Sequence, residues 1–600
     1  MATSYNGKIL RINLSNKTYK MEDLDLNLAK KFVGGRGLGT KIYMDEVDPM
    51  IDPLSPDNKV VLINGPLTGT AVATGCRYMV VTKSPLTGVI ACSNSGGKWG
   101  ATLKYAGFDA VILEGKSEKP CYVNIVDDKK VEFFDATNLW GMTTEECKEE
   151  LEKAHEGASV LNIGPAGETL SLVAAVMNEG ERAAGRSGVG AVVGSKNLKA
   201  ICVSASRGAI PVYDADAFKA AAAKCMGIIR ENGTTGTGLP TFGTAVLVNI
   251  MNQVGAYPTN NWQEAYDEKA DDTSGETLKD TLLVKNSFCH RCPIGCGRVV
   301  KIDGKEVGGP EYETIWAFGS NCGVSDLEAI SRANIMCNEM GNDTISVGCT
   351  IAAAMELYQK GFIKEEECEG VPLVWGSGEA IVKWTERMGR GETALGKLMA
   401  QGSYRLCEHY GQPDISMTVK KLEIPAYDAR GVQGIGVTYA TSNRGGCHVR
   451  GYTISPEVLG TPEALDRTSA ENKHVWSIAF QNLTSVIDSS GLCLFTSFAL
   501  SAPEYAELIN AATGTNYDVD GLIEVGERIY NLERLYNQKA GMKPEDDTLP
   551  KRLLEEPIPS GTSKGQVSKL AEMLPKYYEA RGWENAFPTK ATLERLGLLD

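Results

Sequence analysis

Four cysteines in this 600-residue chain have the type and spacing that an iron–sulfur cluster requires. Cys289, Cys292 and Cys296 follow the spacing C-x2-C-x3-C, and Cys493 supplies a fourth thiol from a distant part of the chain. Thiolates are soft ligands that favour zinc or iron–sulfur clusters over hard cations. Zinc sites usually present two C-x2-C-like pairs, and only one is present here. The sequence therefore predicts one [4Fe–4S] cluster, and the alternative is a chance run of buried cysteines.

Two aspartates occupy stretches of related form. Asp343 precedes a run that is predicted to open a helix, and Asp488 lies where a helical run ends, shortly before Cys493. A carboxylate beside backbone amides at such a position can bind the N–H-rich edge of a heterocycle. The alternative is that each aspartate only caps a helix. If Asp488 does bind a heterocycle, one loop holds both a cluster and a cofactor.

Glycine-rich turns with nearby arginines favour a phosphorylated cofactor. Exposed backbone N–H groups in such loops bind phosphate, and arginine side chains do so as well. None of the turns matches a P-loop or a dinucleotide-binding fingerprint, so a plain turn is the alternative for each one taken singly. The four clusters are residues 34–37, 65–69, 93–98 and 183–190, and the arginines are Arg36, Arg77, Arg182 and Arg186.

The composition is typical of a soluble protein with several domains. Hydrophobic residues make up 42% and charged residues 23% of the chain, and 600 residues exceed the ~100–200 of one domain. No apolar run reaches the ~20 residues that span a bilayer, and residues 1–8 lack the pattern of a signal peptide. Sixteen cysteines without an export signal favour reduced thiols in a cytoplasm. The net charge of −15 argues against nucleic acid and anionic membranes as partners.

The first part of the chain is predicted to be rich in β-structure. Short runs that carry β-branched residues between turn signals predict strands, and residues 127–130 predict a hairpin turn. Two helical patches, at 26–33 and 144–155, interrupt the strands. The predicted strands are residues 8–14, 60–64, 79–82, 110–113, 122–126 and 131–134.

From residue 214 onward the apolar spacing favours helices. The predicted helices are residues 217–229, 326–339, 351–360, 462–487 and 522–541. We place the first boundary close to Pro211, where the character of the sequence changes. The predicted fold class is α+β, with three domains: a β-rich domain at 1–208, a mostly helical domain with the cysteine triplet at 209–417, and a mostly helical domain with His448 and Cys493 at 418–600.

Taken together, these residues resemble the tungsten-dependent aldehyde:ferredoxin oxidoreductase family over essentially the whole chain. The resemblance rests on the cysteine triplet with Cys493 and on the order and spacing of further motifs. It implies a β-rich N-terminal domain that forms a base for two pterins, capped by two largely helical domains. The further motifs are Gly309-Pro310-Glu311-Tyr312-Glu313-Thr314, Arg444-Gly445-Gly446-Cys447-His448, Asp488-Ser489-Ser490-Gly491-Leu492-Cys493 and the glycine-rich stretches 93–98 and 183–190.

The resemblance also implies the cofactors and the residues that hold them. These cofactors are a tungsten atom bound by two pterins, with molybdenum as the alternative metal, one [4Fe–4S] cluster, and Mg²⁺ joining the pterin phosphates. Glu313 and His448 correspond to the pair beside the metal. Asp343 and Asp488 correspond to the pterin-binding aspartates, and Arg77 to the arginine between cluster and pterin. The remaining implied cofactor contacts are Arg182, Arg450 and Leu492, with the backbone carbonyls of Asn94 and Ala184 on the magnesium.

The sequence departs from the family pattern in two places. Ser346-Val347-Gly348 replaces the usual ending after Asp343, which weakens one half of the pterin assignment. Residues 337–340 lack the E-x-x-H that binds iron between subunits in some members. The sequence therefore argues against an iron-bridged dimer and leaves the oligomeric state open.

The implied reaction interconverts aldehydes and carboxylic acids and passes electrons through the cluster to ferredoxin or a small iron–sulfur subunit. Because oxidation adds an oxygen from water, a carboxylate base is useful, and Glu313 is the candidate. His448 can donate a hydrogen bond to the carbonyl oxygen. We assign Glu311 a structural role, although an extended run would place it on the same face as Glu313.

Two other functions stay open, and one difficulty concerns the partner. The chain could be a family-related subunit that reduces an aromatic acyl-CoA in a larger pocket, or a non-catalytic iron–sulfur electron-transfer subunit. Docking of an acidic ferredoxin on an acidic protein requires a basic patch near the cluster. The candidates for that patch are Arg291, Arg298 and Lys301.

Overall fold

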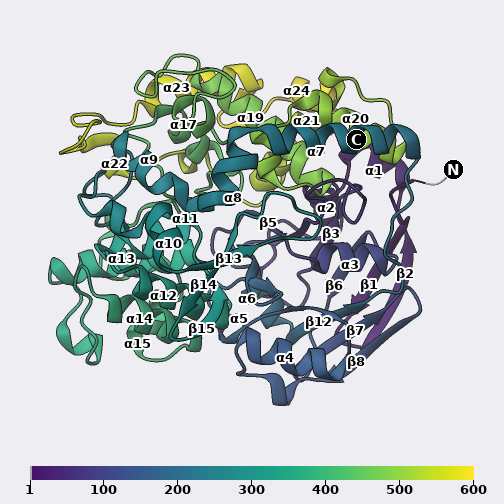
Figure 1. The fold of residues 1–600 in the computed structure, drawn as a ribbon, viewed down its shortest axis with the longest axis horizontal. Coiled ribbons are helices and arrows are strands. Elements are labelled where there is room, and N and C mark those ends of the chain that lie inside the picture. Colours follow the sequence, from purple (N-terminus) through teal and green to yellow (C-terminus); the bar gives the residue numbers. More distant parts are fainter. Residues whose placement is uncertain (1–2, 600) are drawn as a thin grey trace.

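Two six-stranded β-sheets, both formed before residue 205, lie together at one side of the molecule (Figure 1). The computed structural model describes residues 3–599, so the first two residues of the stretch tested for a signal peptide lie outside it, as does Asp600. The strand order is β2-β1-β6-β3-β4-β5 in the first sheet and β11-β10-β9-β12-β7-β8 in the second. Neighbouring strands are antiparallel except for β1 with β6 and β7 with β12. The first sheet contains β1 (Lys8–Asn13), β2 (Thr18–Asp23), β3 (Val60–Asn64), β4 (Tyr78–Lys83), β5 (Ile90–Ser95) and β6 (Ala110–Glu114), and the second contains β7 (Cys121–Val126), β8 (Lys130–Asp135), β9 (Ser159–Asn162), β10 (Val176–Asn178), β11 (Arg182–Ala184) and β12 (Leu198–Ser204).

All six strands predicted from the sequence are present, and the predicted hairpin joins β7 to β8. The prediction missed β5, which carries the first half of the glycine-rich stretch at 93–98. It also missed β2 and β12, which have six and seven residues, and β9 to β11, which are only three or four residues long. Runs as short as β9 to β11 give too few alternating positions for a strand to stand out from a turn.

The two sheets bury a common apolar layer between them. Side chains from both sheets meet there with Trp99, the first residue of α3 (Trp99–Tyr105), and with Val192 of α6 (Val189–Ser195). The opposite face of the first sheet is covered by α1 (Leu26–Phe32), α2 (Gly35–Glu46), α20 (Ala502–Thr513) and α21 (Val519–Lys539). Helices from near both ends of the chain therefore complete one core.

The rest of the chain is mostly helical and surrounds a second, larger core. Asp214 caps α7 (Ala215–Glu231) by accepting from the amide of Ala217 at 2.9 Å. The remaining α-helices of at least five residues are α4 (Thr144–Ala154), α9 (Leu247–Gln253), α10 (Gly275–Thr281), α11 (Tyr312–Phe318), α12 (Leu327–Met340), α13 (Thr344–Gln359), α14 (Gly378–Arg390), α15 (Ala394–Met399), α16 (Ser403–His409), α17 (Gln433–Thr441), α19 (Lys473–Ser490), α22 (Lys551–Glu555), α23 (Leu570–Arg581) and α24 (Lys590–Arg595). Across residues 3–599, no helix is both long and apolar enough to cross a membrane.

Two predictions about helices were wrong. The helix predicted over 462–487 begins only at Lys473. Asn472, directly before it, has a positive φ of 59°, so the backbone at Asn472 is not α-helical. The glycine cluster at 34–37 is not a simple turn, because α2 begins at Gly35. A Cβ on Gly35 would lie 2.3 Å from the carbonyl oxygen of Asp488, so glycine lets α2 pack directly on the backbone of α19.

A small antiparallel sheet supports the cysteine triplet. It consists of β13 (Leu283–Ser287), β14 (Gly297–Ile302) and β15 (Lys305–Gly308), with β14 in the centre. The triplet lies in the connection between β13 and β14, whose ends pair from Ser287 to Gly297. The sheet therefore fixes both ends of the loop that carries Cys289, Cys292 and Cys296.

Candidate functional site

The structure brings the four predicted ligand cysteines to one small cavity. The connection between β13 and β14 supplies Cys289, Cys292 and Cys296, and Cys493 follows directly after the C-terminal end of α19. Gly491 has a φ of 92° at that end, a conformation that glycine adopts without strain, and it turns the chain toward the cavity. The Arg77 guanidinium also lines the cavity and donates to the Cys493 sulfur at 3.1 Å.

The arrangement of the thiols suits a cluster better than a single ion. Thiolates that share one Zn²⁺ each lie about 2.3 Å from it. Within residues 3–599, no three His, Cys, Asp or Glu side chains are placed to hold a single metal ion. Four thiols that line one cavity without converging on a point are the donors that an iron–sulfur cluster uses.

A fifth thiol, missed by the sequence analysis, lines the same cavity. Cys76 is fully buried beside Cys289. Its hydrogen bond to Cys289, helped by the charges of Arg182 and Arg77, holds the pKa of Cys289 well below its usual range. Burial raises the pKa of Cys292 and Cys296. The only signal in the sequence was the position of Cys76 immediately before Arg77.

A larger cavity of about 490 Å³ adjoins the four-cysteine cavity. Arg77, Arg182, Ser287, Cys289 and Cys296 line both, so the two are separated by only a thin layer of side chains. Arg182 donates to Ser287 Oγ at 2.9 Å and is held there. Other residues of the large cavity come from the segments that carry the predicted site: Gly185, Glu311, Glu313, Asp343, His448, Tyr452, Phe495 and Phe498.

Glu313 and His448 face each other at the wall of this cavity. Glu313 Oε1 lies 3.6 Å from His448 Nε2. The other carboxylate oxygen of Glu313 accepts from the amide of Ala426 at 3.0 Å. Neither Glu313 Oε1 nor His448 Nδ1 has a hydrogen-bond partner among the described residues, although both atoms are buried. Two buried polar atoms therefore remain available to a molecule in the cavity.

The surroundings keep this pair uncharged near neutral pH. Burial raises the pKa of Glu313 to about 8, against the lowering effects of the Ala426 amide and Arg186. Burial, together with the positive charges of Arg186 and Arg444, holds the pKa of His448 well below its usual range. A carboxyl with a raised pKa in a cavity is a typical sign of an acid–base group.

Glu311 and Glu313 do not share a face, contrary to the prediction for an extended run. Because α11 begins at Tyr312, Glu311 lies before the helix and Glu313 lies in its first turn, and the two carboxylates have different neighbours. Glu311 accepts from Thr244 Oγ1 at 2.5 Å and lies near Arg182. Glu313 alone lies beside His448.

Asp343 caps α13, which is the alternative to heterocycle binding that the sequence analysis gave for this residue. Its carboxylate accepts from the amides of Ile345 at 3.2 Å and Ser346 at 3.3 Å. Arg186, which the sequence singled out only as part of a glycine cluster, donates to Asp343 Oδ2 at 3.2 Å. Asp343 also lines the large cavity, so capping does not exclude a contact with a ligand there.

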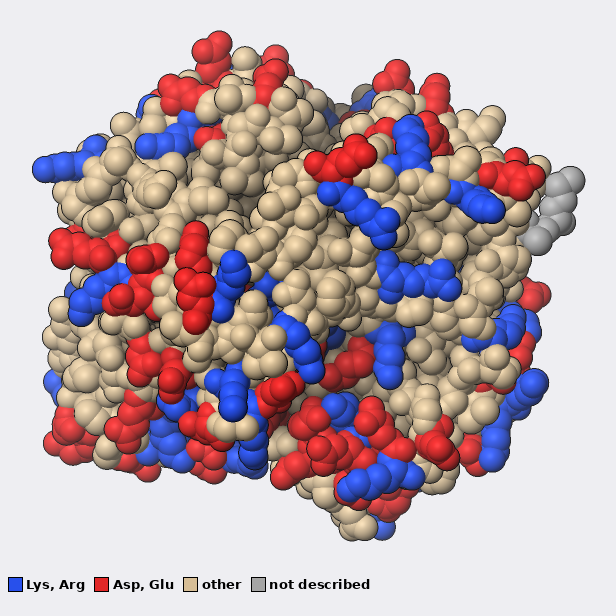
Figure 2. Space-filling model, viewed as in Figure 1, with Lys and Arg blue, Asp and Glu red and all other residues tan. Residues whose placement is uncertain are grey.

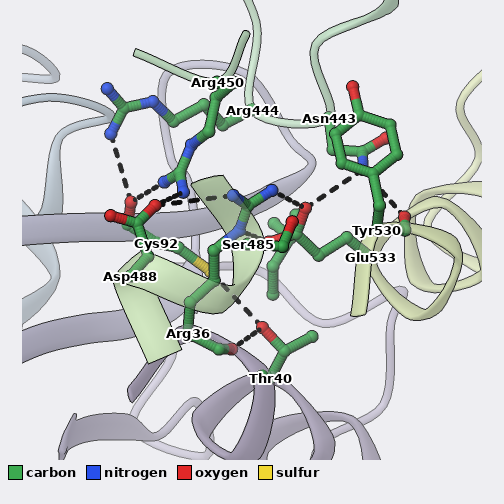
Figure 3. Close-up of polar contacts among 12 residues, drawn as sticks. Arg36, Thr40, Cys92, Asn443, Arg444, Arg450, Ser485, Asp488, Tyr530 and Glu533 are labelled. Atoms are coloured by element: carbon green, nitrogen blue, oxygen red, sulfur yellow. Dashed lines mark hydrogen bonds and ion pairs between the residues drawn. The ribbon is translucent and has the colours of Figure 1, made fainter. Parts of the chain in front are cut away.

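Asp488 lies in a different environment, outside both cavities. It is in the last turn of α19 and faces Arg450 at 2.7 Å and Arg36 at 3.4 Å (Figure 3). Arg36 also forms a two-pronged ion pair with Glu533, at 2.6 and 2.7 Å. The Arg450 guanidinium binds the carbonyl oxygen of Cys92 as well. The prediction that Asp488 lies at a helix end is confirmed, but its partners are arginines and not backbone amides.

The remaining predicted contacts lie near these groups without lining the large cavity. Asn94 is on β5, accepts from Arg77 at 3.2 Å and has its amide nitrogen 3.5 Å from Asp488. Ala184 ends β11, where the amide of Arg186 donates to Ser93 of β5 at 3.2 Å. Leu492 is buried between Gly491 and Cys493. These contacts place β5, β11 and the end of α19 in one region of the molecule.

Arg298, one of the three candidates for the predicted basic patch, does not lie on the surface. Arg298 is buried and donates to the backbone carbonyls of Gly295 and Gly297. Its guanidinium therefore fixes the cysteine loop instead of facing a partner. Arg291 and Lys301 are exposed.

Comparison with known proteins places these features in a family. Models of the N-terminal domain and of domains 2 and 3 of aldehyde ferredoxin oxidoreductase match residues 9–205 and 220–598. The chain is 50% identical to a tungsten-containing aldehyde ferredoxin oxidoreductase of Pyrococcus furiosus and 49% identical to one of Thermococcus kodakarensis, with 99% of each chain covered. Among solved structures, the active site complex BamBC of benzoyl coenzyme A reductase shares the fold, with a TM-score of 0.86, 24% identity and coverage of 100% of this chain and 98% of that one.

Proposed function

Because the chain belongs to the aldehyde ferredoxin oxidoreductase family, we propose that it is a tungsten-dependent enzyme that interconverts aldehydes and carboxylic acids, with ferredoxin as the electron partner. The observation that carries the proposal is the Glu313–His448 pair, whose unpartnered atoms face a cavity next to four cysteine thiols. The protein works in the cytoplasm, where its sixteen cysteines stay reduced.

The residues present fit the cofactors of such an enzyme. Cys289, Cys292, Cys296 and Cys493 would hold the [4Fe–4S] cluster, and Arg77 would lie between cluster and pterin. When bound, a bis-pterin tungsten centre would supply a two-electron redox change, and the cluster would supply a path for single electrons. The proposed pterin contacts are Asp343, Arg182, Asp488, Arg450 and Leu492, and the proposed magnesium ligands are the carbonyls of Asn94 and Ala184.

Glu313 and His448, at the cavity wall, have different roles in the proposed reaction. Oxidation of an aldehyde consumes one water and releases two electrons and two protons. Glu313 accepts a proton from that water when its carboxyl is ionised, and the unpartnered Oε1 is the atom that receives it. Neutral His448 donates a hydrogen bond to the aldehyde oxygen from a ring nitrogen that carries a proton. Both roles require a substrate carbon near the two side chains.

Aromatic side chains around the pair favour an apolar aldehyde. The Tyr427 and Tyr452 rings have their centroids 5.6 and 6.3 Å from that of His448, and their hydroxyl oxygens lie 3.1 Å apart. Phe498 packs against Tyr452 at 5.8 Å. Apolar and aromatic walls with few polar groups bind apolar ligands, so aldehydes with an alkyl or aryl group should be preferred over phosphorylated ones.

The comparisons favour this function over the two alternatives. Relatives about 50% identical over the full chain are aldehyde ferredoxin oxidoreductases, whereas the acyl-CoA reductase structure, at 24% identity, shares only the fold. A non-catalytic electron-transfer subunit would have no use for a cavity with a buried, unpartnered glutamate and histidine.

Quantitative analysis of the protein purified without oxygen tests the cofactor assignment. We expect one tungsten, two pterins and four irons per chain, together with aldehyde-dependent reduction of a viologen dye. Iron without tungsten or molybdenum would support the electron-transfer subunit instead. One pterin per metal, or a nucleotide attached to the pterin, would contradict the proposed pair of pterin sites.

A further inference from the structure

We propose that an acidic ferredoxin docks on the surface around Phe288 and Arg291, which we term the cluster face. It also includes His290, Lys98 and Arg207. The proposal rests on the proposed function, which requires electrons to leave through the four-cysteine site. The proposal places the site where electrons leave on one side of the molecule, at residues that have no part in binding the aldehyde.

An exposed aromatic ring marks the centre of the cluster face. Phe288 immediately precedes Cys289 and is 57% exposed, more than the other exposed aromatic side chains of residues 3–599. Its ring packs over the backbone of Gly295, where an added Cβ would lie 2.3 Å from the ring. The ring therefore covers the cysteine loop on one side and faces solvent on the other. An aromatic side chain of this kind is a typical anchor of a protein interface.

Positively charged side chains lie in the cysteine loop that follows this ring and on the segment beside that loop. Arg291 lies between two of the cysteines, with a φ of 53° that holds it in an exposed turn. The amide of His290 donates to the carbonyl of Gly97 at 3.1 Å, which brings exposed Lys98 to the same surface. Among the described residues, the side chains of Arg291 and Lys98 form no ion pair, although the backbone amide of Lys98 donates to the Glu179 carboxylate at 2.9 Å.

A third cation joins the cluster face through Tyr105. The Tyr105 hydroxyl lies 3.1 Å from His290 Nε2, and Arg207 Nε donates to the Tyr105 carbonyl at 3.1 Å. Arg207 is exposed and forms no ion pair within residues 3–599, although its charge acts on nearby Asp128, which pairs with Lys8 at 2.7 Å. Its contact with Tyr105 extends the basic area from the cysteine loop to the end of α3.

The charge of the whole molecule makes this area unusual. The chain carries a net charge of −15, so most of its surface repels an acidic protein. In Figure 2, the area over β13, β5 and α3 is mainly uncharged with lysine and arginine around it, whereas aspartate and glutamate gather over α4. A local positive area on a negative protein steers an acidic partner to one place and raises the rate of encounter.

Charge reversal on the cluster face tests the proposal. Arg291→Glu and Arg207→Glu, combined in one variant, should weaken binding of a purified acidic bacterial ferredoxin to the holoenzyme by about tenfold or more at low salt. The dependence of this affinity on ionic strength should become flatter. Phe288→Ala should weaken binding at every ionic strength, because it removes an apolar contact. The affinities are measured by titration calorimetry without oxygen.

The controls separate docking from chemistry. Lys590→Glu makes the same type of charge change on α24, which packs on other elements, and should leave ferredoxin binding unchanged. Iron content and aldehyde oxidation with a viologen dye should stay near wild type in every variant. Unchanged ferredoxin affinity and salt dependence in the double variant would overturn the proposal. If the wild-type protein shows no aldehyde oxidation with the dye, the proposed function is refuted. The binding measurement would still decide where ferredoxin docks.

Discussion

At the scale of single residues, the environment of Glu313 decides its chemistry more than its place in a motif does. The sequence analysis named Glu313 as the base and gave Glu311 a structural role, and the start of α11 at Tyr312 separates the two side chains. Only Glu313 has an unpartnered oxygen beside His448. The surroundings of Glu313 therefore support its proposed role as the base.

The raised pKa of Glu313 predicts a specific pH dependence. A base acts only when it is ionised, and burial raises the pKa of this carboxyl to about 8. We expect kcat/KM for an aldehyde to rise about tenfold per pH unit below pH 8 and to level off above it. His448, with a pKa well below its usual range, stays neutral and adds no second transition near neutral pH. Steady-state dye reduction between pH 6 and 9.5 measures this, and a flat profile would exclude Glu313 as the base.

The five thiols around the small cavity give a second test at this scale. Cys289→Ala should lose cluster iron, because it removes a proposed ligand. Cys76→Ala should keep four irons per chain, because Cys76 contacts Cys289 but does not belong to the predicted ligand set. Iron analysis and the EPR signal of the reduced protein distinguish the two. Iron loss in Cys76→Ala with retention in Cys289→Ala would reverse the assignment.

At the scale of elements, glycine-rich segments position the site by close backbone packing. From the sequence alone, we interpreted these segments as phosphate-binding loops or plain turns. Gly35 at the start of α2 and Gly65 after β3 instead touch the backbone of residues 488–491. A Cβ on Gly65 would lie 2.1 Å from the carbonyl carbon of Ser490. These contacts hold the segment that leads to Cys493, and single-sequence patterns carry no sign of them.

This packing predicts a strong effect of Gly65→Ala. The added methyl group must displace the backbone near Ser490, and such overpacking costs about 1–3 kcal/mol. We expect a lower thermal midpoint and less cluster iron, since Cys493 follows in the same segment. Gly208→Ala is the matched control, because a Cβ there meets no atom within 4 Å. Equal midpoints and equal iron contents in the two variants would show that the close approach has no structural role.

At the scale of the whole molecule, local patterns were predictable and distant partnerships were not. The β-rich first part, the cysteine loop and the helix that begins after Asp343 all follow from spacing and propensity over a few residues. The network that links Arg36 to Asp488 and Glu533 joins residues more than 450 positions apart. In the sequence, a charged residue that will be buried looks the same as one on the surface, because its partner lies far away along the chain. The predicted division into domains at 208 and 417 and the absence of an iron-bridged dimer stay predictions.

The same network predicts how the two ends of the chain depend on each other. Arg36→Met should destabilise the protein by about 3–5 kcal/mol, because it leaves the buried carboxylate of Glu533 without its two-pronged partner. Adding Glu533→Gln should recover part of that loss, since the unpaired charge is then removed as well. Thermal unfolding of the single and double variants measures the coupling. Strictly additive losses would show that the pair is energetically independent.

The central claim is that aldehyde oxidation takes place at Glu313 beside His448, and one comparison tests it most directly. Aldehyde-dependent dye reduction is measured without oxygen for Glu313→Gln and Glu311→Gln, with tungsten and iron contents verified for both. Glu313→Gln keeps the shape but removes the base, so turnover should fall by roughly 10²–10⁴, whereas Glu311→Gln should have a milder effect. Near-normal turnover in metal-replete Glu313→Gln, or a severe loss in Glu311→Gln alone, would contradict the claim.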